Sequence, residues 1–150
     1  MDITEVADRL AIAETLALYC RGIDRCDGAL LAEVFTPDAL IDYGDGAKPI
    51  AETIPGLMAG LGSMRLTQHN ISNTVMRLAG ETARAETNCV ALHIIPTPDG
   101  EIELVHKAEP GAAVKAQGAY RRDDGQWVYR RLSARALWDQ IVRCTYDHAE

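Results

Sequence analysis

The chain has 150 residues, of which 47% are hydrophobic and 25% are charged, so it is long enough for one domain with its own core. Its net charge of −7 argues against nucleic-acid binding as the main task, and no apolar run reaches the length of a membrane span. The acidic N-terminus lacks the basic start and apolar core of a secretory signal. We therefore expect a single cytoplasmic domain over residues 1–150. The four cysteines form no CxxC pair and have no zinc-like spacing, which favours reduced thiols and predicts no metal site.

Residues 7–27 have the apolar spacing of an amphipathic helix that ends over residues 24–27, with Gly28 as the break. At about 100° per residue, Asp24 falls inside the apolar arc. A carboxylate that points at a core is unfavourable unless a polar group meets it, so the sequence predicts a partner for Asp24 elsewhere in the chain. The other members of the arc are Val6, Leu10, Ile12, Ala13, Leu16, Ala17, Tyr19, Cys20 and Ile23.

The remaining chain predicts two short helices and then a series of strands. The helices are expected over residues 29–35 and 50–62, with a short strand over residues 39–43 between them. Long strands are expected over residues 67–78, 82–95, 112–122 and 126–138, and residues 101–106 alternate well enough for a strand extension. Helices followed by antiparallel strands indicate an α+β fold. Strands of this length bend, and a bent sheet with a helix across it makes a cone, so we expect a pocket.

Two of the long strands carry a histidine, and strand alternation places each histidine on the same face as every second residue. On the first strand the face is formed by His69, Ile71, Asn73 and Val75. On the second strand the face is formed by Ala85, Thr87, Cys89, Ala91 and His93. We expect Cys20 and Cys89 to pack as small hydrophobic side chains.

Several short motifs, taken in chain order, resemble the SnoaL-like branch of the nuclear transport factor 2-like (NTF2-like) fold. The motifs are IDRCD at 23–27, FTPDA at 35–39, DY at 42–43, TQH at 67–69 and YRRDDGQW at 120–127. The likeness covers nearly the whole chain and is nearest to the scytalone dehydratase family. It implies an α+β, NTF2-like cone in which three N-terminal helices and a strongly curved antiparallel sheet enclose a pocket.

The resemblance also implies a catalytic set. The family pairs an aspartate at the end of the first helix with a histidine on a long strand, and Asp24 and His69 occupy these positions here. Its tyrosine on the first strand corresponds to Tyr43, and its second histidine corresponds to His93. A carboxylate that accepts from one ring nitrogen fixes the tautomer and orients the other nitrogen as a general base. The alternatives are a buried structural ion pair for Asp24 and His69, and core packing for the other two residues.

This chain departs from the family at two places. Ile23 stands where the family has a tyrosine, and residues 114–116 lack the family's serine and asparagine. Tyr19 matches a tyrosine of related bacterial dehydratases and could fill the polar role that Ile23 cannot, with core packing as its alternative. Asn73 and Trp138 are candidates for substrate contacts, and bonding to the backbone or simple packing are their alternatives.

These residues predict a cofactor-independent lyase, a dehydratase that acts on a cyclic or aromatic hydroxy-ketone. His69 would remove a proton next to the carbonyl, Tyr43 would steady the enolate oxygen, and His93 would help the hydroxyl leave as water. A ketone isomerase, or loss of another leaving group, is the alternative within the enzyme class. A non-catalytic ligand-binding or assembly module is the alternative from another class. The expected partners are a small apolar cyclic substrate and further copies of the chain in a homodimer or homotrimer, with no nucleic acid and no membrane.

Overall fold

The chain begins with two helices, two strands precede the third helix where the sequence predicted one, and the remaining strands follow. The computed structural model describes residues 2–96, 102–104, 113–123 and 126–136. The elements are α1 (Ile3–Asp24), α2 (Gly28–Glu33), β1 (Phe35–Asp42), β2 (Lys48–Pro49), α3 (Ile50–Gly62), β3 (Leu66–Ala79), β4 (Thr82–Pro96), β5 (Ile102–Leu104), β6 (Ala113–Asp123) and β7 (Gln126–Ala136). In this part of the chain, no helix is both long enough and apolar enough to span a membrane.

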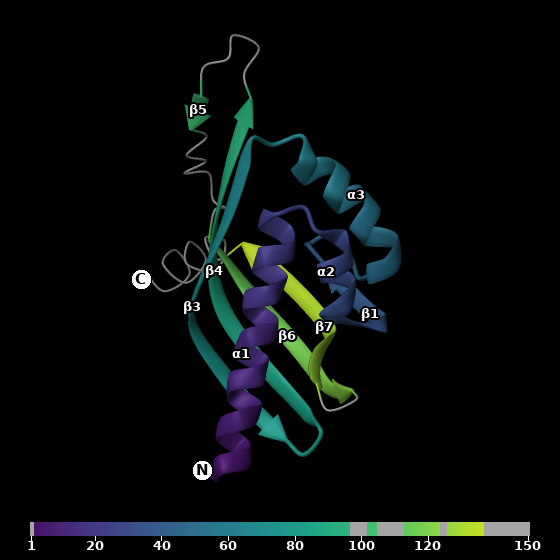
Figure 1. Ribbon diagram of the computed structural model, residues 1–150, viewed down its shortest axis with the longest axis vertical. Coiled ribbons are helices and arrows are strands. Elements are labelled where there is room, and N and C mark those ends of the chain that lie inside the picture. Colours follow the sequence, from purple (N-terminus) through teal and green to yellow (C-terminus); the bar gives the residue numbers. More distant parts are fainter. Residues whose placement is uncertain (1, 97–101, 105–112, 124–125, 137–150) are drawn as a thin grey trace, which may run out of the picture.

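The strands of the described residues form one seven-stranded sheet, in the order β2-β1-β7-β6-β4-β3, with β5 paired to β4. The pairs β3–β4, β4–β6 and β6–β7 are antiparallel, as predicted, whereas β1 runs parallel to β7. Figure 1 shows α1 lying across the curved sheet, with α2 and α3 on the side where β1 lies. This arrangement confirms the predicted α+β class. β3 is the last strand at one edge, where Arg9 of α1 donates to the carbonyl of Met76 at 3.3 Å.

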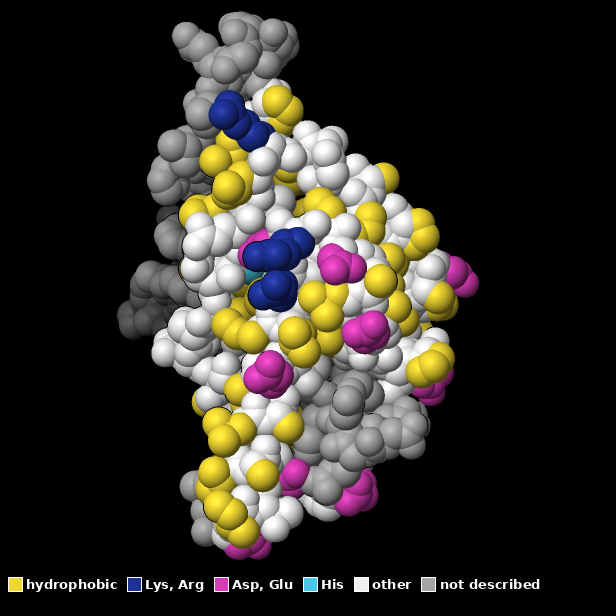
Figure 2. Space-filling model, in the orientation of Figure 1, with side chains coloured by type: hydrophobic (Ala, Val, Ile, Leu, Met, Phe, Trp, Pro, Cys, Tyr) yellow, Lys and Arg dark blue, Asp and Glu magenta, His cyan; other side chains and the backbone are white. Residues whose placement is uncertain are grey.

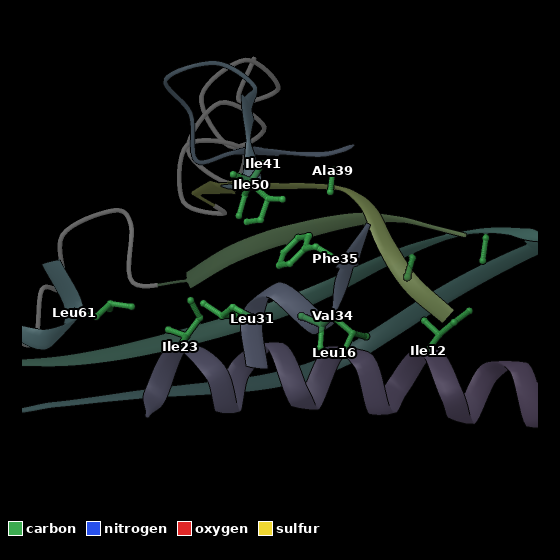
Figure 3. Close-up of a cluster of buried hydrophobic side chains, with 12 residues drawn as sticks. Ile12, Leu16, Ile23, Leu31, Val34, Phe35, Ala39, Ile41, Ile50 and Leu61 are labelled. Carbon is green, nitrogen blue, oxygen red and sulfur yellow. The ribbon is translucent and has the colours of Figure 1, made fainter. Parts of the chain in front are cut away.

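The core lies between the helices and the sheet (Figure 3). Its members come from α1, α2, α3, β1 and β4 and from the residue that follows α2: Ile12, Leu16, Ile23, Leu31, Val34, Phe35, Ala39, Ile41, Ile50, Leu61, Ala83 and Ala85. Gly22 lets α1 and α2 approach closely, because a Cβ atom at this position would lie 2.9 Å from the side chain of Leu31. The core therefore fixes the C-terminal end of α1, which carries Asp24.

The structure corrects the apolar arc predicted for α1. Ile12 and Leu16 are buried, but Leu10 is 67% exposed and Ala13 and Ala17 are also exposed. Apolar residues surround more than half of this helix, and the sheet covers one side of it, so the outer part of the predicted arc faces solvent in the described structure. Asp24 lies at the border between the two sides.

The end of α1 differs from the predicted glycine stop. Cys26 adopts a positive φ of 52° and donates its N–H to the carbonyl of Ile23 at 3.1 Å. Asp27 donates its N–H to the carbonyl of Gly22 at 2.8 Å, which completes a Schellman turn with cysteine at the position that usually carries glycine. Gly28 instead begins α2, where the Asp27 side chain accepts from the Leu30 N–H at 3.0 Å.

A bulge in β3 corrects the face predicted for that strand. The register with β4 shifts between Ser72 and Val75, and Asn73 has a φ of +52°. The extra residue reverses the alternation beyond it, so Asn73 is exposed and Val75 is 64% exposed rather than aligned with His69. The register of β4 with β6 is unbroken, and its predicted inner face is buried at Ala85, Thr87 and Cys89.

Candidate active site

The carboxylate of Asp24 meets His69 on the edge strand. Asp24 Oδ1 lies 2.7 Å from His69 Nδ1, and Asp24 Oδ2 accepts the His69 backbone N–H at 2.9 Å. Oδ1 also accepts the hydroxyl of Thr67 at 3.1 Å. The side chains of His69 and Asp24 are 14% and 23% exposed. The inward carboxylate at the end of α1 therefore has the polar partner that its position required.

This pairing fixes what the imidazole can do. A carboxylate beside Nδ1 favours the tautomer in which Nδ1 carries the proton, and the lone pair of His69 then lies on Nε2. A histidine held in this way can take a proton from a bound molecule at Nε2 while Asp24 stabilises the resulting imidazolium. In Figure 2, only a small area of histidine is visible beside the Lys and Arg side chains near the C-terminal end of α1, where Arg21 and Arg25 are exposed.

His93 lies next to this pair on β4. It is the cross-strand partner of Thr67, and its ring centroid is 5.7 Å from that of His69. Burial, and then the neighbouring His69, hold the pKa of His93 below its ordinary value of 6.5, against a smaller opposite effect of Asp24. Its Nε2 is buried and has no hydrogen-bond partner within the described residues. A buried nitrogen of this kind is a position for a polar atom of a ligand or for an ordered water.

Tyr19 and Tyr43 form a second polar pair. Their hydroxyl oxygens are 2.8 Å apart, and the ring of Tyr19 packs edge-on against Phe35 with centroids 6.0 Å apart. Burial raises the pKa of Tyr19 well above 10, with a further increase from Tyr43, and burial also raises the pKa of Tyr43. Both hydroxyls therefore stay protonated at neutral pH. When Tyr19 donates to Tyr43, the Tyr43 proton is available to a third oxygen.

The two buried cysteines, Cys20 and Cys89, have raised pKa values. Burial, then Cys89 and Asp24, raise the pKa of Cys20 to about 12, and burial together with Asp24 raises the pKa of Cys89. Both thiols also contribute to the raised pKa of Tyr19. Because their pKa values are raised, both thiols are neutral at physiological pH and pack as small apolar groups. The thiolate is the reactive form of cysteine, so neither thiol is suited to act as a nucleophile.

The structure places five of the seven predicted site residues in two groups: Asp24, His69 and His93 form one, and Tyr19 and Tyr43 form the other. Asn73 sits apart from this set on the β3 bulge, and Trp138 lies outside the described residues. Thr67 is the contact that the sequence interpretation missed, although its position two residues before His69 places both on one face. Where the chain is described, no group of three or more His, Cys, Asp or Glu side chains is arranged to hold a metal ion.

Comparison with known proteins gives the relatives of this chain. The SnoaL-like domain family matches residues 4–133. The uncharacterized protein Rv2910c of Mycobacterium tuberculosis is 34% identical over 94 residues, which are 59% of this chain and 63% of that protein. The chain thus spans less than two thirds of the length of this relative.

Solved structures share the fold at low sequence identity. A proposed scytalone dehydratase from Novosphingobium aromaticivorans has a TM-score of 0.70 at 21% identity, with 90% of this chain and 87% of that chain covered. The hexachlorocyclohexane dehydrochlorinase LinA-type3 from Novosphingobium barchaimii has a TM-score of 0.73 at 19% identity, with 91% of each chain covered. From the family match and this shared architecture, the chain belongs to the SnoaL-like domain family and has the NTF2-like fold.

Proposed function

We propose that the protein is a cofactor-independent lyase, a dehydratase that acts on a cyclic or aromatic hydroxy-ketone. The observation that carries this proposal is the Asp24–His69 pair, in which a partly buried carboxylate accepts the backbone N–H of His69 and lies 2.7 Å from its ring nitrogen Nδ1. Such a pair is suited to removing a proton from carbon next to a carbonyl. The similarity in fold to a proposed scytalone dehydratase and to a dehydrochlorinase supports elimination as the class of reaction.

The other polar groups suit a substrate with two oxygen atoms. The hydroxyl of Tyr43 can donate to a carbonyl oxygen, and it remains protonated at neutral pH because its pKa is raised. The buried Nε2 of His93 can hydrogen-bond to a hydroxyl group. Burial favours the neutral form of this histidine, so it is suited to orienting a hydroxyl group rather than to binding an anion.

The proposed reaction balances without a redox partner. His69 Nε2 takes the proton from the carbon beside the carbonyl, and the electron pair of that C–H bond forms the enolate. The enolate then forms the new carbon–carbon double bond as the bond to the leaving hydroxyl breaks. The hydroxyl takes up the proton that His69 removed and departs as water. An isomerase would share the first step and return the proton to another carbon.

Proton exchange in heavy water tests this function directly. The protein is incubated with a panel of cyclic hydroxy-ketones, and deuterium at the carbon beside the carbonyl is followed by mass spectrometry, together with loss of water. Wild type should incorporate deuterium, and His69→Ala and Asp24→Asn should lower the rate about 10²- to 10⁴-fold. Gln68→Ala is the matched control, because this exposed neighbour of His69 has no contact with Asp24 among the described interactions.

Two outcomes separate the alternatives. Exchange without loss of water would replace the dehydratase with an isomerase. No exchange with any ketone, together with ligands that raise the melting temperature equally in wild type and in both site variants, would replace the enzyme with a binding module.

A further inference from the structure

Thr67 occupies a position that connects the two histidines. It is 8% exposed, it lies two residues before His69 on β3, and it is the cross-strand partner of His93 on β4. Its hydroxyl donates to Asp24 Oδ1, the same oxygen that lies beside His69 Nδ1. The three hydrogen-bond donors to Asp24 among the described residues therefore all come from Thr67 and His69.

The geometry of these donors decides how firmly the carboxylate is held. The His69 backbone N–H holds Oδ2 at one point, and a carboxylate held at one point can still rotate about its Cβ–Cγ bond. A donor to Oδ1 that is independent of the imidazole removes this rotation, and Thr67 Oγ1 is that donor at 3.1 Å. The side chain of Thr67 is itself stiff, because it is β-branched and buried in a strand.

We infer that Thr67 is a positioning residue, whose hydroxyl fixes the plane of the Asp24 carboxylate and thereby holds His69 in one ring orientation with its proton on Nδ1. In kinetic terms the inference rests on the proposed function, since the oriented Nε2 is the proposed base. The positioning of Asp24 and His69 by Thr67 does not depend on any reaction. The groups that lie against His69 are Asp24 at the end of α1 and His93 on β4. The buried thiols of Cys20 and Cys89 act electrostatically on Asp24.

The tautomer of His69 can be measured in the free protein. Long-range ¹H–¹⁵N correlation spectra distinguish the protonated from the unprotonated ring nitrogen. Wild type and Thr67→Ser should show a single tautomer with the proton on Nδ1, because both keep the hydroxyl. Thr67→Val has a similar shape without the hydroxyl, and should give averaged ¹⁵N shifts from both tautomers. Thr67→Ala also lacks a donor and is the second variant in case the valine variant does not fold.

A second threonine provides the matched control. Thr87 is also buried on the sheet, at 1% exposure, and its hydroxyl donates to Thr74 Oγ1 at 3.1 Å rather than to Asp24. Thr87→Val should therefore leave the His69 spectrum as in wild type. With a substrate in hand, Thr67→Val should lower kcat about tenfold with KM within about twofold, because one hydrogen bond to a charged group is lost, and Thr67→Ser should restore kcat.

The outcomes distinguish this inference from the proposed function. If Thr67→Val, or Thr67→Ala in its place, keeps a single Nδ1-protonated His69, Thr67 is not a positioning residue, whether or not wild type turns over a ketone. If the tautomers mix but no ketone exchanges a proton, the positioning role stands and the proposed function fails. If Thr87→Val disturbs His69 as much as Thr67→Val does, the effect is general packing and the inference is overturned.

Discussion

Asp24 combines two roles at the scale of a single residue. It is the last residue of α1, and the Schellman turn formed by Cys26 and Asp27 ends the helix directly after it. Its two carboxylate oxygens have three hydrogen-bond partners on β3, namely Thr67 Oγ1 and the backbone N and Nδ1 of His69. The position of this carboxylate therefore depends on both α1 and β3. The helical periodicity placed this carboxylate on the apolar arc, because the direction of a helical side chain depends on local spacing. The hydrogen bond from the Thr67 hydroxyl was not predicted, because a threonine in a strand carries no unusual signal.

Removing the hydroxyl of Tyr43 should separate its chemical role from packing. In Tyr43→Phe the ring remains but the donor to a substrate oxygen is lost, and kcat should fall about 10- to 100-fold, somewhat less than for an oxyanion-hole donor. The melting temperature should change little, because Tyr43 is 42% exposed. Steady-state kinetics on the ketone identified by heavy-water exchange provides the measurement. An unchanged kcat would assign the Tyr19–Tyr43 pair to structure alone.

Cys26→Gly should stabilise the protein. Cys26 has a φ of 52° at the end of α1, a conformation that is unfavourable for residues with a Cβ atom and that glycine adopts readily. After subtraction of the greater chain entropy of glycine, the free energy of unfolding should rise by about 0.5–1 kcal/mol. Urea denaturation measures the change. Cys26→Ala keeps the Cβ atom and should give no gain, and an equal gain from alanine would contradict this explanation.

At the scale of elements, the contact between α1 and α2 depends on the absence of a side chain. Gly22→Ala should lower the free energy of unfolding by about 1–3 kcal/mol, because the new methyl group would overlap the side chain of Leu31. Gly60→Ala in α3 is the matched change, since a Cβ atom there meets nothing within 4 Å. It should raise stability by up to about 1 kcal/mol through helix propensity. Equal effects at the two glycines would show that the helix contact does not decide the result.

The sequence predicted the elements better than their pairing. The bounds of α3 agree with the prediction over residues 50–62, because apolar spacing is a local property. The parallel pair of β1 with β7 joins distant parts of the chain and leaves no local trace. The bulge at Asn73 was not predicted either. Asparagine tolerates a positive φ better than most residues do, but a single asparagine in a sequence does not show that its φ is positive. One such residue was enough to invalidate the face predicted beyond Ile71.

At the scale of the whole molecule, stability should depend on the protonation of His93. Its pKa in the folded protein is below 6.5, so the unfolded chain binds more protons than the folded chain once the pH falls below about 6.5. The contribution of His93 is fully present above that pH, decreases as the pH falls towards its lower folded-state pKa, and then levels off. Urea unfolding of wild type between pH 7.5 and pH 5.5 should show this loss.

His93→Gln is the control for this pH dependence, because glutamine does not titrate. The variant should lose less stability than wild type over the same interval. An equal loss would mean that other groups cause the pH dependence. The predicted homodimer or homotrimer stays a prediction, and sedimentation equilibrium at the same two pH values would measure it.

The hydrogen bond from the His69 backbone to Asp24 also affects the exposed edge of the sheet. β3 is the outermost strand of the described sheet, and an outermost strand with unpaired N–H and C=O groups can recruit the strand of another molecule. Asp24 occupies the N–H of His69 on this strand, and Arg9 occupies the carbonyl of Met76. The proposed general-base pair is therefore also part of the barrier against self-aggregation. We expect Asp24→Ala both to abolish the proposed proton transfer and to free the His69 N–H for pairing with another strand.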